Sequence, residues 1–128
     1  IAAAEGRGTV EAALTRRATL LRAWQRFLAE WPVVLCPVSA EPPFPDHLDL
    51  EGDAAFERIL EAQLTQIALP LLGLPGLAVA TGAPGAPMGV QLVGPRMRED
   101  VLLEAGAAIE AARPPLRPVE PFAAGGAP

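Results

Sequence analysis

The 128-residue sequence contains no lysine, no tyrosine and no asparagine, and it has one cysteine and one histidine. Because all ten positive residues are arginine, the chain by itself cannot form a lysine Schiff base, a serine–lysine pair or a lysine-containing phosphate loop. The lone thiol of Cys36 excludes an internal disulfide and fits a reducing, cytoplasmic location. The net charge of −5 gives no electrostatic reason to expect nucleic acid or an anionic membrane as a partner.

A long stretch without any ionisable side chain lies between Glu61 and Arg96, a composition that membrane spans share. Its prolines and glycines interrupt it well before the ~20 continuous helical residues that a span requires. We therefore expect no membrane partner and predict two short strands, at residues 77–81 and 89–93, joined as a hairpin. Neither strand alternates apolar with polar residues, which is typical of a sheet covered by helices on both faces.

Three helices are predicted from apolar residues spaced three and four positions apart. The first runs from Val10 to Trp31 and is stopped by Pro32. The second opens at Asp53 and runs to about residue 71, and the last covers residues 101 to about 112. One face of the second helix carries its apolar residues, which are Phe56, Ile59, Leu60, Leu64, Ile67 and Leu71.

The predicted order of elements is helix, strand, loop, helix, strand, strand, helix, with the first strand at residues 33–36 and a proline-rich loop after it. This is an α/β pattern that looks cut from something larger. Since the chain begins with Ile1 and no basic-then-apolar leader follows, we expect an internal or trimmed segment. Residues 1–112 then form one segment of a domain, and residues 113–128 form a proline-rich tail that is extended or disordered.

A possible nucleophile and a possible base lie close together in the sequence. The residues concerned are Cys36, Ser39, Asp46 and His47. A catalytic pair needs the base within hydrogen-bond reach of the nucleophile, so the proline-rich loop would have to fold back. The simpler interpretation is a buried cysteine at a strand end, a serine hydroxyl bonded to the backbone and a surface histidine. The sequence alone leaves both interpretations open.

An acidic run in the same loop raises the question of a metal site. It consists of Asp46, Asp49, Glu51 and Asp53, with His47 among them. The spacing does not match the ligand ladder of a calcium loop, and one histidine is too few for a typical zinc site. The glycines between residues 73 and 94 suggest a phosphate loop, but the prolines among them remove N–H donors. We therefore expect no metal and no cofactor.

Several segments together resemble the C-terminal region of the amidase signature family. They are LRAWQRFLAEWPVVLCPVSAEPPFP, LPLLGLPGLAVATG, PMGVQLVG and REDVLLEAGAAIE, and the resemblance runs from about Leu14 to Ala112. The sequence departs from the family pattern at Pro70, where asparagine is common, and at Ala80, where proline is common. Pro32 or Val33 also stands where the family commonly has an acid. These departures concern local contacts on the substrate side.

The resemblance implies part of an α/β/α sandwich whose mixed central sheet is covered by helices on both faces. It also implies hydrolysis of a carboxamide C–N bond by a serine nucleophile, a serine in a cis peptide and a lysine base. Those residues belong to a glycine- and serine-rich signature upstream of the matched region, so we assign no catalytic residue to this chain. The expected partners are a small carboxamide substrate and the missing N-terminal portion of the fold.

Three residues are predicted to lie on the substrate side of such an enzyme: Pro43, Phe44 and Gln91. Gln91 is the single amide in an apolar strand, so it is either a structural bridge or a pocket wall. Two alternatives to an amidase segment remain at this point. One is a stand-alone, non-enzymatic binding or scaffold module of the same fold, and the other is a small hydrolase that uses Cys36 or Ser39.

Overall fold

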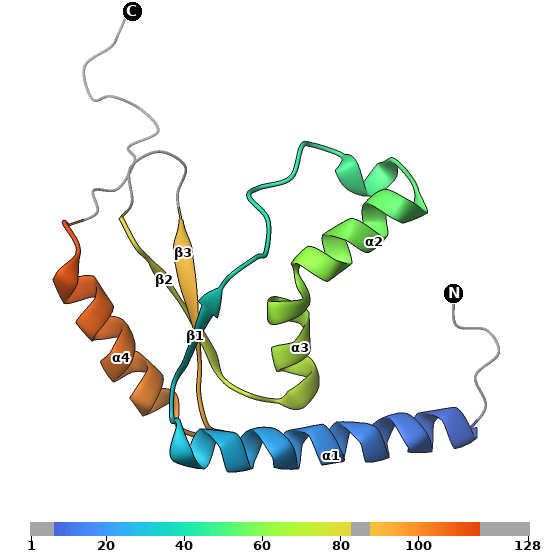
Figure 1. The fold of residues 1–128 in the computed structure, drawn as a ribbon, viewed down its shortest axis with the longest axis horizontal. Coiled ribbons are helices and arrows are strands. Elements are labelled where there is room, and N and C mark those ends of the chain that lie inside the picture. Colours follow the sequence, from blue (N-terminus) through green and yellow to red (C-terminus); the bar gives the residue numbers. More distant parts are fainter. Residues whose placement is uncertain (1–6, 83–87, 116–128) are drawn as a thin grey trace, which may run out of the picture.

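The computed structural model describes residues 7–82 and 88–115, in which helices lie on two sides of a small sheet (Figure 1). The elements, in chain order, are α1 (Arg7–Glu30), β1 (Val34–Pro37), the 3-10 helix η1 (Leu48–Leu50), α2 (Asp53–Ala62), α3 (Leu64–Leu72), β2 (Gly76–Ala80), β3 (Gly89–Val93) and α4 (Glu99–Ala112). Residues 83–87 of the predicted hairpin turn and residues 116–128 of the predicted tail lie outside the described part. None of the described helices combines the length and apolar character needed to cross a membrane.

The sheet is antiparallel and has the strand order β1-β3-β2. β2 pairs with β3, with Leu77 opposite Leu92, so the predicted pairing of these two strands is confirmed. β1 pairs with the other side of β3, with Leu35 also opposite Leu92. Every described strand pairing is antiparallel, so the parallel pairs of a mixed sheet are not found among residues 7–82 and 88–115.

Helix α4 covers one face of the sheet. Leu102 of α4 is buried against Val79 and Leu92, which point to this face from the two paired strands. Gly106 allows the helix to approach β2 closely, since a Cβ atom at this position would lie 2.7 Å from Cδ2 of Leu77. Acidic residues in the first turn of α4 interact favourably with the helix dipole.

Helices α1 and α3 pack over the opposite face. Leu28 of α1 and Leu69 of α3 meet Val93 of β3 in a second buried cluster. Arg17 strengthens the contact between the two helices, because its Nε donates to the carbonyl oxygen of Leu71 at the end of α3. The cluster therefore joins α1, α3 and β3 across a wide separation in sequence.

The predicted second helix is divided into two at Gln63, which separates α2 from α3. The prediction of one continuous helix was wrong because the spacing of the apolar residues continues unchanged across the break. Helix α3 then ends at Gly73, whose φ of 68° is the left-handed conformation that glycine adopts easily. Backbone N–H groups of Gly73 and Leu74 both bond to the carbonyl oxygen of Leu69 and close the helix end.

The described sheet is less covered than its apolar sequence predicts. Gly76, Ala78 and Ala80 of β2 are exposed, and so is Leu35 of β1. The apolar face of α2 and α3 is largely exposed as well. Residues 7–82 and 88–115 thus leave one face of β1 and of β2 exposed, whereas Gln91, Leu92 and Val93 of the central strand β3 are buried on both faces.

Candidate functional site

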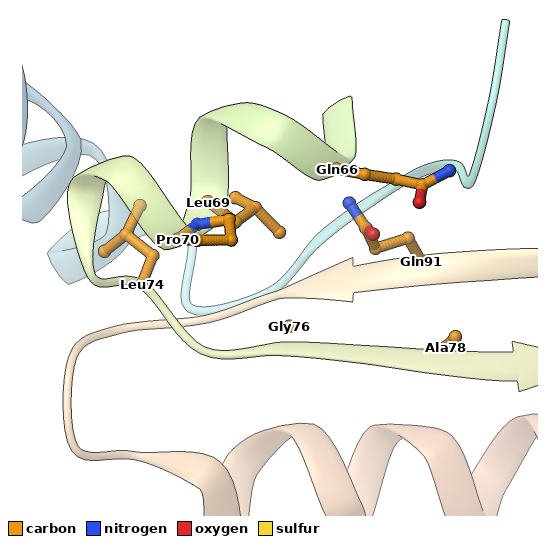
Figure 2. Close-up of a pocket in the computed structure, with 7 residues that line it drawn as sticks. All are labelled: Gln66, Leu69, Pro70, Leu74, Gly76, Ala78 and Gln91. Carbon is orange, nitrogen blue, oxygen red and sulfur yellow. The ribbon is translucent and has the colours of Figure 1, made fainter. Parts of the chain in front are cut away.

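The residue with the clearest site geometry is Gln91, in the middle of β3. A cavity of about 270 Å³ lies beside it, between β2, β3 and helix α3 with the turn that follows it (Figure 2). The lining residues are Gln66, Leu69, Pro70, Leu74, Gly76, Ala78 and Gln91. The wall is therefore mostly apolar, with two side-chain amides at one end. This is the usual chemistry of a small-molecule pocket, which combines an apolar lining with a few polar groups.

The amide of Gln91 is buried and held in place. Its Nε2 donates to the carbonyl oxygen of Thr65 at 3.0 Å and lies 3.8 Å from Sγ of Cys36 on the neighbouring strand. Gln91 therefore has both features that the sequence analysis left as alternatives. It is a structural bridge between β3 and α3, and it lines the wall of the cavity. A role in substrate binding remains a prediction.

Two polar residues that the sequence analysis missed complete this link. Thr65 donates from Oγ1 to the carbonyl oxygen of Val38 at 3.0 Å, and Gln66 donates to the same oxygen from Nε2 at 2.9 Å. Both residues belong to the first turn of α3, so they hold the exit of β1 against this helix. The signal in the sequence was the pair of polar residues at the start of an otherwise apolar helix.

A second cavity, of about 240 Å³, lies where the chain leaves β1. It is lined by Pro37, Val38, Ser39, Glu41, Pro42, Pro43, Met88 and Gly89. Of the two loop residues predicted to face substrate, Pro43 lines this cavity, whereas Phe44 is half-buried and lines neither this cavity nor the one beside Gln91. Val38 connects the two regions, because it lines the second cavity and its carbonyl oxygen is bonded by Thr65 and Gln66 of α3.

The candidate pairing of Cys36 or Ser39 with His47, which the sequence left open, does not form among the described residues. Cys36 Sγ lies 3.6 Å from the carbonyl oxygen of Gln91, and Ser39 Oγ lies 3.4 Å from that of Ala62. His47 is instead exposed and lies 3.4 Å from the carboxylate of Asp46. The structure therefore places Cys36 and Ser39 in the simpler roles, as a strand residue and a turn hydroxyl.

The acidic residues of the loop are spread from Asp46, in the turn before η1, to Asp53, the first residue of α2. Within the described part of the chain, no group of three or more histidine, cysteine, aspartate or glutamate side chains is arranged to hold a metal ion. Glu41 has a different role, since Arg58 of α2 donates to both of its carboxylate oxygens. The side-chain hydrogen bond from Arg58 lowers the pKa of Glu41 below its usual value.

A comparison with protein families decides the identity of the fold. The family model described as Amidase matches residues 2–103. The chain belongs to the amidase family. The predicted resemblance is thus confirmed, and the α/β architecture described above is that of an amidase-family segment.

Relatives of this amidase-family chain include two kinds of named protein. The indoleacetamide hydrolase of Bradyrhizobium japonicum is 45% identical over 93 residues, which cover 70% of this chain and 20% of the relative. The indoleacetamide hydrolase of Bradyrhizobium diazoefficiens is 40% identical over 70% of this chain and 18% of the relative. A glutamyl-tRNA(Gln) amidotransferase subunit of Streptococcus thermophilus is 32% identical over 74% of this chain and 19% of the relative.

A solved structure supports the same assignment. The structure of 6-aminohexanoate cyclic dimer hydrolase complexed with substrate is similar with a TM-score of 0.66 and 26% sequence identity. The similarity covers 88% of this chain and 26% of that chain. The amidase-family chain thus spans about a fifth of the length of the curated relatives that it matches.

Proposed function

We propose that this chain is a C-terminal segment of an amidase that hydrolyses a small carboxamide. The segment contributes strands and covering helices to an α/β/α sandwich with a mixed sheet, and Gln91, Pro43 and Phe44 form part of the substrate wall. The observation that carries the proposal is the family match over residues 2–103, combined with relatives about five times longer than the matched segment.

The chemistry of such an enzyme requires groups that this chain lacks. A lysine removes a proton through a serine in a cis peptide, and the nucleophilic serine attacks the amide carbon. The C–N bond then breaks and the amine leaves with a proton, after which water cleaves the serine ester and releases the carboxylic acid. Because the chain has no lysine, we assign these catalytic residues to the upstream portion of the fold and propose that the chain alone is inactive.

An aryl-acetamide type of substrate is favoured over an aminoacyl-tRNA. The relatives named for indoleacetamide are 45% and 40% identical to this chain, whereas the amidotransferase subunit is 32% identical. The mostly apolar lining of the Gln91 cavity fits the side of an enzyme that receives an apolar acyl group. A cytoplasmic location stays a prediction.

Ammonia release from indole-3-acetamide tests the proposal with three samples. They are the purified chain, the Bradyrhizobium japonicum hydrolase without its matched segment, and the two proteins co-expressed. We expect ammonia only from the co-expressed pair. Hydrolysis by the purified chain, or none by the folded pair, would contradict the proposal. If the purified chain were active, the variants Cys36→Ala and Ser39→Ala would show whether either residue is its nucleophile.

A further inference from the structure

Exposed apolar side chains recur at regular spacing along both α2 and α3. They are Phe56, Leu60, Leu64, Ile67 and Leu71, which we call the α2–α3 stripe. Their spacing of three or four residues continues across the break at Gln63. Each side chain is between 39% and 62% exposed, so the described residues leave the whole stripe open to solvent.

Helix α3 has the composition of a helix from a protein interior. Its sequence, LTQIALPLL, contains no ionisable residue on any face. One side is already used, since Leu69 and Leu72 are buried in the cluster with α1 and β3. An uncharged, mostly apolar helix is normally covered on more than one side, which indicates that the α2–α3 stripe has a partner.

Uncovered apolar surface also occurs away from this stripe. Residues 9–16 of α1 are all exposed, and they include Val10 and Leu14. Figure 1 shows this half of α1 running past α3 with no described element beside it. Leu35 of the edge strand β1 is exposed too. The uncovered features therefore belong to several separate elements.

We propose that the α2–α3 stripe is the docking surface for the upstream portion of the amidase fold. This inference rests on the proposed function and names the surface by which the two portions join. An isologous contact with a second copy would cover one patch on each chain and leave the other features exposed. The part of the relatives that this chain does not match is about four fifths of their length, which is large enough to cover all of them.

The chemistry of the partner surface follows from that of the stripe. An apolar, uncharged helix face requires an apolar contact surface, as found in the cores of permanent interfaces. An aspartate placed in the middle of such an interface would be buried without a counter-charge and would weaken the contact strongly. The same substitution on a helix face outside the interface would change little.

Two leucines of equal exposure provide the test. Leu71 lies in the α2–α3 stripe, on a helix without charged residues, whereas Leu103 lies on α4 one turn after the acidic Glu99 and Asp100; both leucines are 62% exposed. The tagged chain, Leu71→Asp and Leu103→Asp are each co-expressed with the Bradyrhizobium japonicum hydrolase that lacks its matched segment. We expect the unmodified chain and Leu103→Asp to retain this protein through purification, and Leu71→Asp to retain at least about tenfold less.

A second variant separates lost docking from lost folding. Leu64→Asp places its carboxylate at the start of α3, where the helix dipole favours a negative charge, so the chain itself is not weakened there. Circular dichroism of each variant checks that the helices are retained. We expect Leu64→Asp to lose the partner as Leu71→Asp does while keeping the spectrum of the unmodified chain.

Three results would contradict the proposal that the α2–α3 stripe is the docking surface. Equal retention by Leu71→Asp, Leu64→Asp and Leu103→Asp would place the interface elsewhere while the proposed function stands. Sedimentation of the purified chain as a dimer that Leu71→Asp dissociates would make a second copy the occupant. Failure of the unmodified chain to retain the partner would also reject the surface. The proposed function is then decided separately, by a chimera in which the two portions are one polypeptide.

Discussion

Replacement of Leu28 by alanine tests whether the second half of α1 is truly part of the core. Leu28 is 1% exposed and packs with Leu69, Leu74 and Val93, which come from α3, the turn after it and β3. Leu14 lies on the same helix but is 58% exposed. The same substitution at the two positions therefore compares a buried leucine with an exposed leucine of the same helix.

The expected difference is large compared with the stability of a small domain. Truncation of a buried leucine to alanine costs about 2–5 kcal/mol, because the transfer energy is lost and a cavity remains. Truncation at an exposed position such as Leu14 is expected to change the free energy of unfolding by less than about 0.5 kcal/mol. A typical domain has only about 5–15 kcal/mol of stability, so Leu28→Ala should remove a large fraction of it.

Urea unfolding followed by tryptophan fluorescence measures this difference. Trp24 packs against the same cluster as Leu28, so its emission reports on the contact directly. With a slope of about 1–3 kcal/mol per molar urea, we expect the midpoint to fall by roughly 1 M or more for Leu28→Ala and very little for Leu14→Ala. Equal midpoints for the two variants would refute the described packing of α1 against α3 and β3.

Two further predictions concern the polar contacts. Gln91→Leu removes the donor to the carbonyl oxygen of Thr65 and should lower the free energy of unfolding by about 1–3 kcal/mol, measured by urea unfolding; no loss of stability would contradict the link between β3 and α3. The carboxyl of Glu41 should titrate by NMR below the ordinary value of 4.5, because Arg58 stabilises its charged form. The stabilisation is present above pH 4.5 and is lost as the pH falls through the lowered pKa, and Arg58→Gln should return the titration toward 4.5. An unchanged titration in this variant would contradict the ion pair.

The hairpin and the main helices could be predicted because their signals are local. Glycines and prolines bound the strands, and the apolar spacing of α1 lies within one element. The break at Gln63 could not be predicted, since the same spacing continues from α2 into α3. The exposure of the α2–α3 stripe could not be predicted either, because the sequence of an apolar helix face is the same whether or not another element packs against it.

The candidate site was predicted only in part. Gln91 was noticed because a lone amide in an apolar strand must find a partner. Its acceptor is a backbone carbonyl, at Thr65, which any residue type can supply, so the sequence contains no sign of it. Pro43 and Phe44 were predicted together as neighbours in the proline-rich loop, yet Pro43 lines the second cavity and Phe44 does not.

The central claim is that this chain supplies a working segment of an amidase, and a chimera tests it most directly. The matched segment of the Bradyrhizobium japonicum indoleacetamide hydrolase is replaced by the aligned residues of this chain, and ammonia release from indole-3-acetamide is measured. We predict a folded chimera whose rate lies within about tenfold of the parent's, a difference of ~1.4 kcal/mol in the barrier. A folded chimera that releases no ammonia would contradict the account.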